Sequence, residues 1–180
     1  MRQLRKKASI RGFFRSHAEA WSPVRLRFLL QDWDDGYNVG GLFRVADACG
    51  AEEVILTGKT PTPESDPRVA VTSLGAHRRV AWRVIASYME AVATMKADGW
   101  SPVAVEVADD AVRHDVFAYP EKTLLVLGTE GAGVFDKVLR ECTAAVFIPM
   151  NGKGRSLNVH VAAAIVAFAA RLSPTPELES

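Results

Sequence analysis

Short apolar runs recur along most of the chain, and each is followed by polar or helix-type sequence. Six of these runs have the length of β-strands. Several are apolar at consecutive rather than alternate positions, which is typical of strands that are covered on both faces. The predicted strands are Arg25–Leu30, Glu53–Thr57, Val80–Ile85, Pro102–Val107, Thr123–Leu127 and Ala144–Ile148.

Apolar residues at helical spacing predict four helices between or after these strands. Ser87 is expected to cap one of them, Asn38 and Ser156 are candidate caps of two others, and Gly50 suits the left-handed backbone of a helix end. Residues 59–68 contain three prolines and predict an irregular loop. The predicted helices are Asn38–Cys49, Ser87 to about Asp98, Phe135–Cys142 and Ser156–Leu172. This alternation predicts an α/β fold with a mostly parallel sheet.

The composition is that of an ordinary globular chain: of 180 residues, 48% are hydrophobic and 24% are charged. This balance excludes collagen, a disulfide scaffold and a disordered chain. The N-terminus lacks an apolar signal core, and the longest apolar run, near Val159–Ala170, favours a buried helix over a membrane span. Cys49 and Cys142 lie in apolar stretches and are expected to be reduced core thiols, so the expected location is the cytoplasm.

The net charge of +1 conceals an asymmetry along the chain. Residues 1–27 contain eight Lys or Arg and one acid, Glu19, whereas the remainder has a net charge of −6. A basic arm suits a polyanionic partner, because Lys and Arg displace counterions from phosphates; a solvated surface tail is the alternative. We expect an arm over 1–20, helical or partly disordered, one domain over 21–173 and a loose tail over 174–180. A second basic cluster contains Arg68, His77, Arg78, Arg79 and Arg83.

Three loops that follow predicted strands carry polar or glycine-rich sequence, and ligands of parallel sheets bind at such strand ends. The first, from Asn38 to Arg44, has paired glycines that permit close approach of a ligand or another backbone. The second, Gly128–Gly133, has neither the dinucleotide fingerprint nor a phosphate-binding loop, and its Glu130 suits hydroxyl or cationic groups. The third, Ile148–Asn158, leads into the last helix. Each loop alone also fits a simple helix cap or tight turn.

Together and in this order, the three loops resemble the three motifs of the SpoU family of RNA ribose 2′-O-methyltransferases, which belong to the SPOUT class. The resemblance extends over about residues 24–172, and the third motif is its most specific part. It implies a Rossmann-like sheet whose C-terminal part is threaded into a deep trefoil knot, S-adenosyl-L-methionine as cofactor, RNA as substrate, and a homodimer. Thr129 and His160 depart from the family pattern, which more often has Asn and Ser there.

The resemblance also assigns roles to residues. Arg44 would be the catalytic residue, either as a general base assisted by an RNA phosphate or, as we favour, as a clamp on that phosphate, because an arginine stays protonated at neutral pH. Asn38 would orient Arg44 or the ribose, and Glu130, Ser156 and Asn158 would fix the nucleotide and the loop. The predicted cofactor-binding residues are Val107, Leu127, Gly128, Glu130, Gly131, Ile148, Met150, Ser156 and Leu157. The predicted RNA-binding residues are Arg5, Lys6, Lys7, Arg11, Arg78 and Arg79.

Two other functions are less consistent with the sequence. A catalytically silent RNA-binding protein on the same scaffold is the main alternative, and the intact catalytic set argues against it. The order and late position of the glycines disfavour a nucleotide-binding oxidoreductase. His77 and His160 lack metal-ligand spacing, so packing or RNA contact is expected and no metal site is predicted. The compact chain favours tRNA over rRNA as the substrate.

Overall fold

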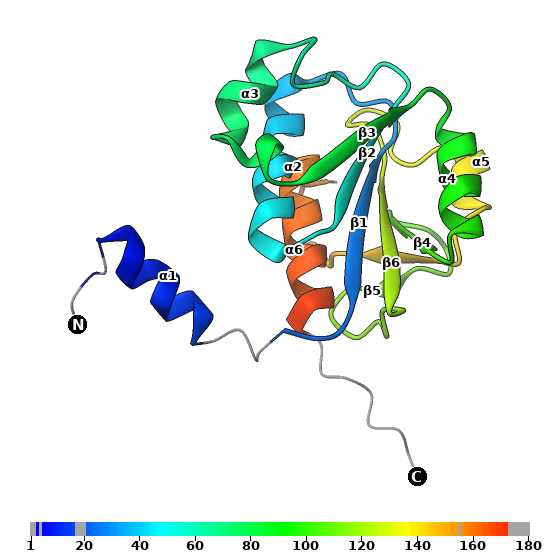
Figure 1. Ribbon diagram of the computed structural model, residues 1–180. Coiled ribbons are helices and arrows are strands. Elements are labelled where there is room, and N and C mark those ends of the chain that lie inside the picture. Colours follow the sequence, from blue (N-terminus) through cyan, green and yellow to red (C-terminus); the bar gives the residue numbers. More distant parts are fainter. Residues whose placement is uncertain (1–2, 4, 17–20, 155, 173–180) are drawn as a thin grey trace.

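The computed structural model describes residues 3, 5–16, 21–154 and 156–172, and its strands form one sheet (Figure 1). The strands are β1 (Arg25–Leu30), β2 (Glu53–Thr57), β3 (Ala81–Ile85), β4 (Ser101–Val105), β5 (Val112–Arg113), β6 (Lys122–Leu127) and β7 (Ala144–Phe147). Their order across the sheet is β3-β2-β1-β6-β4-β7-β5, and every neighbouring pair runs parallel. The predicted α/β fold with a mostly parallel sheet is confirmed; the short strand β5 was not predicted.

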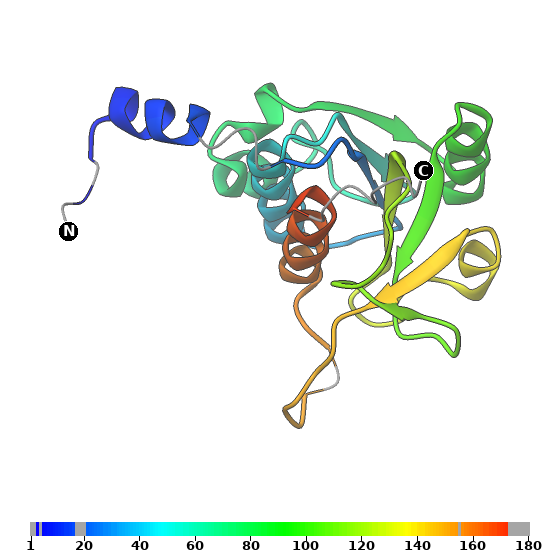
Figure 2. The ribbon, with the colours of Figure 1, turned by 90° about the horizontal axis from the view of Figure 1, so that it is seen from below.

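Two groups of helices cover the sheet. One face carries α2 (Gly36–Cys49), α3 (Pro67–Ser73), the 3₁₀ turn η2 (Ala76–Arg78) and α6 (Val159–Leu172), and the other carries α4 (Tyr88–Ala97) and α5 (Asp136–Leu139). Figure 2 shows α2 and α6 on one side of the strands and α4 and α5 on the other. The buried apolar residues form two hydrophobic cores. On β1, Phe28 and Leu30 belong to one core and Leu29 belongs to the other. Alternate side chains of one apolar run therefore fill two separate cores.

Helix α2 begins two residues earlier than predicted. Asp35 is its cap, because its Oδ1 accepts the N–H of Tyr37 at 2.9 Å. Asn38 therefore lies inside the first turn, and its predicted role as a cap is wrong. The predicted end is confirmed: Gly50 follows the helix with a left-handed φ of 69°.

Helix α6 begins later than predicted, at Val159 rather than at Ser156. Asn158 caps it: its side-chain Oδ1 accepts the N–H of His160 at 3.1 Å, and its carbonyl accepts the N–H groups of Val161 and Ala162. The predicted role of Ser156 as the cap is wrong. Ser156 instead belongs to the segment without regular secondary structure that leads into the helix.

The proline-rich loop at 59–68 ends in a helix that was not predicted. Pro67 is the first residue of α3, and Asp66 caps the helix through its side chain. Helix α3 packs tightly on α2 at Gly40, where a Cβ would lie 2.7 Å from the carbonyl oxygen of Val69. The paired glycines of the first motif therefore do permit the close approach of another backbone.

The strand order determines where loops from distant parts of the chain meet. Strand β6 lies between β1 and β4, and β7 lies on the other side of β4. Because all these strands run parallel, the loops that follow β1, β4, β6 and β7 emerge at one edge of the sheet. The deep knot that the family resemblance implies stays a prediction.

Helix α1 (Lys7–Arg15) falls within the predicted arm and lies apart from the sheet and its covering helices (Figure 1). None of its side chains is buried. The tail predicted over 174–180 lies outside the described residues. Among the helices of the described ranges, none is long and apolar enough to cross a membrane.

Candidate active site

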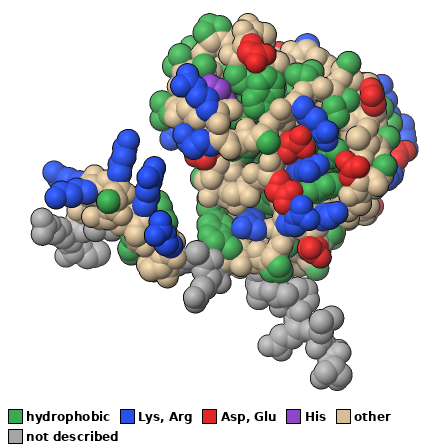
Figure 3. Space-filling model, in the orientation of Figure 1, with side chains coloured by type: hydrophobic (Ala, Val, Ile, Leu, Met, Phe, Trp, Pro, Cys, Tyr) green, Lys and Arg blue, Asp and Glu red, His purple; other side chains and the backbone are tan. Residues whose placement is uncertain are grey.

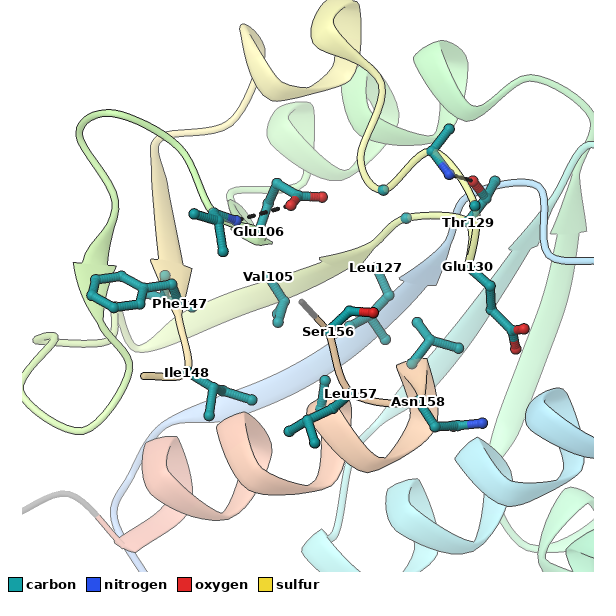
Figure 4. Close-up of a pocket in the computed structure, with 18 of the residues that line it drawn as sticks. Val105, Glu106, Leu127, Thr129, Glu130, Phe147, Ile148, Ser156, Leu157 and Asn158 are labelled. Carbon is teal, nitrogen blue, oxygen red and sulfur yellow. Dashed lines mark hydrogen bonds between the residues drawn. The ribbon is translucent and has the colours of Figure 1, made fainter. Parts of the chain in front are cut away.

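A cavity of about 550 Å³ opens at the carboxyl ends of β4, β6 and β7 (Figure 4). Val105 and Leu127 line it from the strands, and Ser156 and Leu157 approach from the segment before α6. Glu130 lies at the same end of the cavity as the cap of α6. All the predicted cofactor-binding residues line this one cavity: Val107, Leu127, Gly128, Glu130, Gly131, Ile148, Met150, Ser156 and Leu157.

The glycine-rich turn after β6 folds back on itself. Thr129 and Gly133 exchange two backbone hydrogen bonds, of 3.0 and 2.9 Å. A Cβ on Gly128 would lie 2.0 Å from the carbonyl carbon of Gly133, so this position requires glycine. The hydroxyl of Thr129 accepts the N–H of Ala132 at 3.0 Å, so threonine stabilises the turn although the family more often has asparagine.

Two polar residues that were not among the predicted site residues hold this turn in place. Gln31, fully buried after β1, donates from Nε2 to the carbonyl of Gly133 at 3.2 Å and accepts the N–H of Phe135 at 3.0 Å. Glu106, directly after β4, accepts N–H groups from the next residue and from Val134, at 2.9 and 2.8 Å. Each of them is a single polar residue directly after an apolar run, which is the sequence signal that could have identified it. Glu106 was not identified because the predicted strand extended to Val107 and therefore included it.

Asn38 is the centre of a hydrogen-bond network that joins the three motifs. Its Nδ2 donates to Oε1 of Glu130, and its Oδ1 accepts from Nδ2 of Asn158 at 2.9 Å. Nδ1 of His160 lies 2.9 Å from the same Oδ1 atom. Gly41 makes room for this ring, because a Cβ there would lie 2.9 Å from it. Two predicted catalytic residues, 92 and 120 positions away from Asn38, are thus in direct contact with it.

The other two predicted catalytic residues lie beside this network. Arg44 is exposed on α2 and forms no hydrogen bond or ion pair with any residue that the structure describes. Its positive charge nevertheless reaches His160 and helps to lower the pKa of that imidazole. Ser156 lines the cavity next to the network.

Acidic groups surround the network. Partial burial raises the pKa of Glu130, and the carboxylates of Asp35 and Asp34 raise it further. Burial lowers the pKa of His160; Asp35 opposes this shift and Arg44 reinforces it. With the carboxylates of Glu106 and Glu130 on its walls, the cavity suits a cationic, partly apolar ligand better than a polyphosphate.

The predicted RNA-binding residues lie in two places. Figure 3 shows Lys and Arg side chains on α1 and over the region of α3. The arm residues are exposed and lie on α1 or directly before it: Arg5, Lys6, Lys7 and Arg11. In the second place, Arg78 is exposed, whereas Arg79 is paired with Asp47 at 2.6 Å. Arg79 is therefore engaged in a contact between the end of η2 and α2.

Among the described residues, Cys49, Cys142 and His77 offer no comparable site. Cys49 is buried, which raises the pKa of its thiol to about 11, and burial also raises the pKa of Cys142. Both are free thiols, as expected. His77 contacts Ser73 at 2.6 Å and packs edge-on against Phe43. The described part of the chain contains no group of three His, Cys, Asp or Glu side chains that could hold a metal ion.

Comparison with known proteins agrees with this geometry. Residues 25–168 match the SpoU rRNA Methylase family. A tRNA (guanosine(18)-2′-O)-methyltransferase from Thermus thermophilus is 34% identical over 149 residues, which are 81% of this chain and 74% of that protein.

Two solved structures are similar as well. An AdoMet-bound rRNA methyltransferase from Sinorhizobium meliloti superposes with a TM-score of 0.76 at 29% identity, over 81% of this chain but only 55% of the other. This chain thus corresponds to just over half of that longer protein. A structure described as giving insights into 2-OH methylation of C/U34 on tRNA has a TM-score of 0.71 at 26% identity, over 83% of this chain and 95% of the other.

Proposed function

Because the chain belongs to the SpoU rRNA methylase family, we propose that it transfers a methyl group from S-adenosyl-L-methionine to a ribose 2′-hydroxyl in RNA. The observation that carries the proposal is the direct contact of Asn38, Glu130 and Asn158, from three distant motifs, beside one cavity. An RNA-binding protein without catalytic activity has no need of this arrangement.

The cavity fits the proposed methyl donor. Its volume of about 550 Å³ lies within the usual range of small-molecule sites, roughly 300–1,000 Å³. Leu127, Ile148 and Leu157 supply apolar surface for an adenosine, and the carboxylates of Glu106 and Glu130 suit a cation. When bound, S-adenosyl-L-methionine supplies a methyl group on a positively charged sulfur.

The protein has to orient the ribose and assist the loss of one proton. Arg44 is exposed and has no described partner, so its guanidinium is available to an RNA phosphate. We assign it the role of a phosphate clamp rather than of a base, since arginine stays protonated at neutral pH. Asn38 orients the groups around it, while Ser156 and Asn158 hold the loop at the cavity.

We propose tRNA rather than rRNA as the substrate. The relative from Thermus acts on tRNA according to its name, and the solved structure with a TM-score of 0.71 is described in terms of 2-OH methylation of C/U34 on tRNA. The basic arm around α1 and the exposed Arg78 are the proposed contacts to tRNA phosphates. The proposed location of the protein is the cytoplasm.

We also propose that the chain forms a homodimer through α6. Val161, Ile165 and Leu172 lie along one side of this helix and are 40%, 36% and 53% exposed. An apolar stripe of this kind is typical of a surface that another subunit covers. Light scattering during gel filtration is expected to give about twice the monomer mass of 19.6 kDa.

A transfer assay tests the activity. The purified full-length protein is incubated with bulk RNA and a methyl-tritiated donor, and incorporated label is located by mapping ribose methylation in separated tRNA and rRNA. We expect label in tRNA. Label in rRNA alone would contradict the substrate, and no incorporation into any RNA would favour the silent RNA-binding protein.

The substitution Arg44→Ala tests the catalytic assignment. We expect turnover to fall by at least ~100-fold while the Kd of S-adenosylhomocysteine stays nearly constant, because Arg44 does not line the cavity. Arg113→Ala, which removes an exposed arginine paired with Asp115, is the matched control and should keep full activity. A variant at Arg44 that retains most of its rate would remove this residue from the mechanism.

A further inference from the structure

His160 is held in place from three sides at the start of α6. Its backbone N–H donates to Oδ1 of Asn158 at 3.1 Å, and its ring nitrogen Nδ1 lies 2.9 Å from Oδ1 of Asn38. The ring also packs against Gly41, where any Cβ would collide with it. The imidazole of His160 is thus fixed within the network that contains the predicted catalytic residues.

The hydrogen bonds of this network determine which ring nitrogen carries the proton. Oδ1 of Asn158 accepts a backbone N–H, so its other amide atom, Nδ2, is a donor. The Asn38 atom that Nδ2 of Asn158 contacts is therefore the acceptor Oδ1. This assignment agrees with the other amide atom of Asn38, Nδ2, which donates to the carboxylate of Glu130. An acceptor needs a donor opposite it, so Nδ1 of His160 carries the hydrogen.

It follows that neutral His160 has its lone pair on Nε2. No residue of the described chain forms a hydrogen bond with Nε2, so this nitrogen is available as a base. The charged groups that face the ring are Asp35 and Arg44 from the side of α2 and, through Asn38, Glu130 from the glycine-rich turn. Burial, reinforced by Arg44 and opposed by Asp35, leaves the pKa of the imidazole below its usual value, so the ring is neutral at pH 7.

We propose that Nε2 of His160 accepts the proton of the ribose 2′-hydroxyl during methyl transfer, an inference that rests on the proposed function. The hydroxyl oxygen forms a bond to the methyl carbon, the electron pair of the broken carbon–sulfur bond stays on sulfur, and the proton moves to Nε2. The resulting imidazolium releases the proton to solvent. Asn38 acts as the positioning residue for the ring, and Arg44 acts on the phosphate without having to lose a proton.

The substitution His160→Asn separates a base from a purely structural contact. The amide Nδ2 of asparagine takes the position of Nδ1 and keeps the hydrogen bond to Asn38, but the side chain has no basic nitrogen. We expect kcat on RNA to fall by ~100-fold or more, while the KM for RNA and the Kd of S-adenosylhomocysteine change by less than about threefold. In His160→Ala, added imidazole should restore part of the lost rate. An asparagine variant with more than about a third of the wild-type kcat would overturn the proposal.

A pH titration supplies a readout that does not depend on the variant's activity. In the wild type, kcat should decrease at low pH with unit slope, and the midpoint should equal the pKa of the His160 imidazole measured by NMR in the complex with S-adenosylhomocysteine. The resonance is assigned by its loss in His160→Asn. A kcat profile that does not follow this pKa would refute the base. If the wild type methylates no RNA but binds S-adenosylhomocysteine, the proposed function fails instead.

Discussion

At the scale of single residues, Asp35 combines two effects that one substitution can separate. Its side chain caps α2, and its negative charge raises the pKa of His160. Asparagine caps a helix about as well as aspartate but carries no charge. In Asp35→Asn, we therefore expect α2 to persist and the pKa of His160 to fall further below its usual value, as measured by NMR titration.

The pH dependence of stability should change in the same variant. Because the pKa of His160 is lower in the folded state than in the unfolded chain, the unfolded chain binds more protons, and stability decreases as the pH falls through the ordinary histidine pKa of about 6.5. In Asp35→Asn, this loss of stability should be larger, and we expect the melting temperature to fall more steeply between pH 7 and pH 5 than in the wild type. Asp47→Asn, which removes a carboxylate paired with Arg79, is the control for the pKa of His160 and should leave it unchanged.

Single residues were predictable from the sequence where their chemistry is local. Gly128 and Gly50 were selected by type, and the structure gives each a position that needs glycine. The cap of α2 was assigned wrongly because Asp35 and Asn38 are both good caps, and only the packing of α2 decides between them. Gln31 was missed because its partners, Gly133 and Phe135, are more than 100 positions away in sequence.

At the scale of elements, the contact between α2 and α3 depends on the absence of one side chain. A Cβ at Gly40 would lie 2.7 Å from the carbonyl oxygen of Val69 and 2.7 Å from Cβ of Thr72. Gly40→Ala should lower the free energy of unfolding by ~1–3 kcal/mol, because two helices must separate. This outweighs the gain of up to ~1 kcal/mol that alanine brings to a helix interior.

Denaturant unfolding measures this effect, and α1 provides a matched control. Gly12 also lies inside a helix, but apart from its chain neighbours and the backbone of its own helix, no atom of the described residues lies within 4 Å of the place where its Cβ would be. Gly12→Ala should therefore leave the stability of the domain unchanged. If Gly40→Ala is as stable as the wild type, the close approach of α3 does not restrict position 40 to glycine.

Elements with a strong apolar pattern were predicted within a few residues, as β1 and β2 show. Helix α3 was missed because its first residue, Pro67, follows two other prolines, and the proline-rich composition concealed the cap Asp66 directly before it. Strand β5 is only two residues long, Val112–Arg113, and has no periodicity to detect. Such elements exist because a neighbouring strand or helix stabilises them, which a local pattern does not encode.

At the scale of the whole molecule, the arm carries the charge asymmetry. On α1, Lys7, Arg11 and Arg15 lie along one side of the helix, because they are spaced four residues apart. Deletion of residues 1–20 should raise the Kd for tRNA and reduce the slope of log Kd against log salt, since each lost phosphate contact reduces that slope by about 0.7–0.9. Binding of S-adenosylhomocysteine should be unaffected, because the cavity lies at the sheet edge.

A charge substitution distinguishes the basic side of α1 from the mere length of the arm. Lys7→Gln combined with Arg11→Gln keeps the helix but removes two charges, and it should reproduce about a third of the change in slope, since the deleted segment holds six Lys or Arg. The matched control is Lys96→Gln combined with Lys122→Gln, two lysines on the far side of the molecule near α4. If both double variants shift the slope equally, RNA responds to the overall charge of the protein and not to the arm. If only the α1 variant shifts it, the basic side of this helix is where the RNA backbone binds.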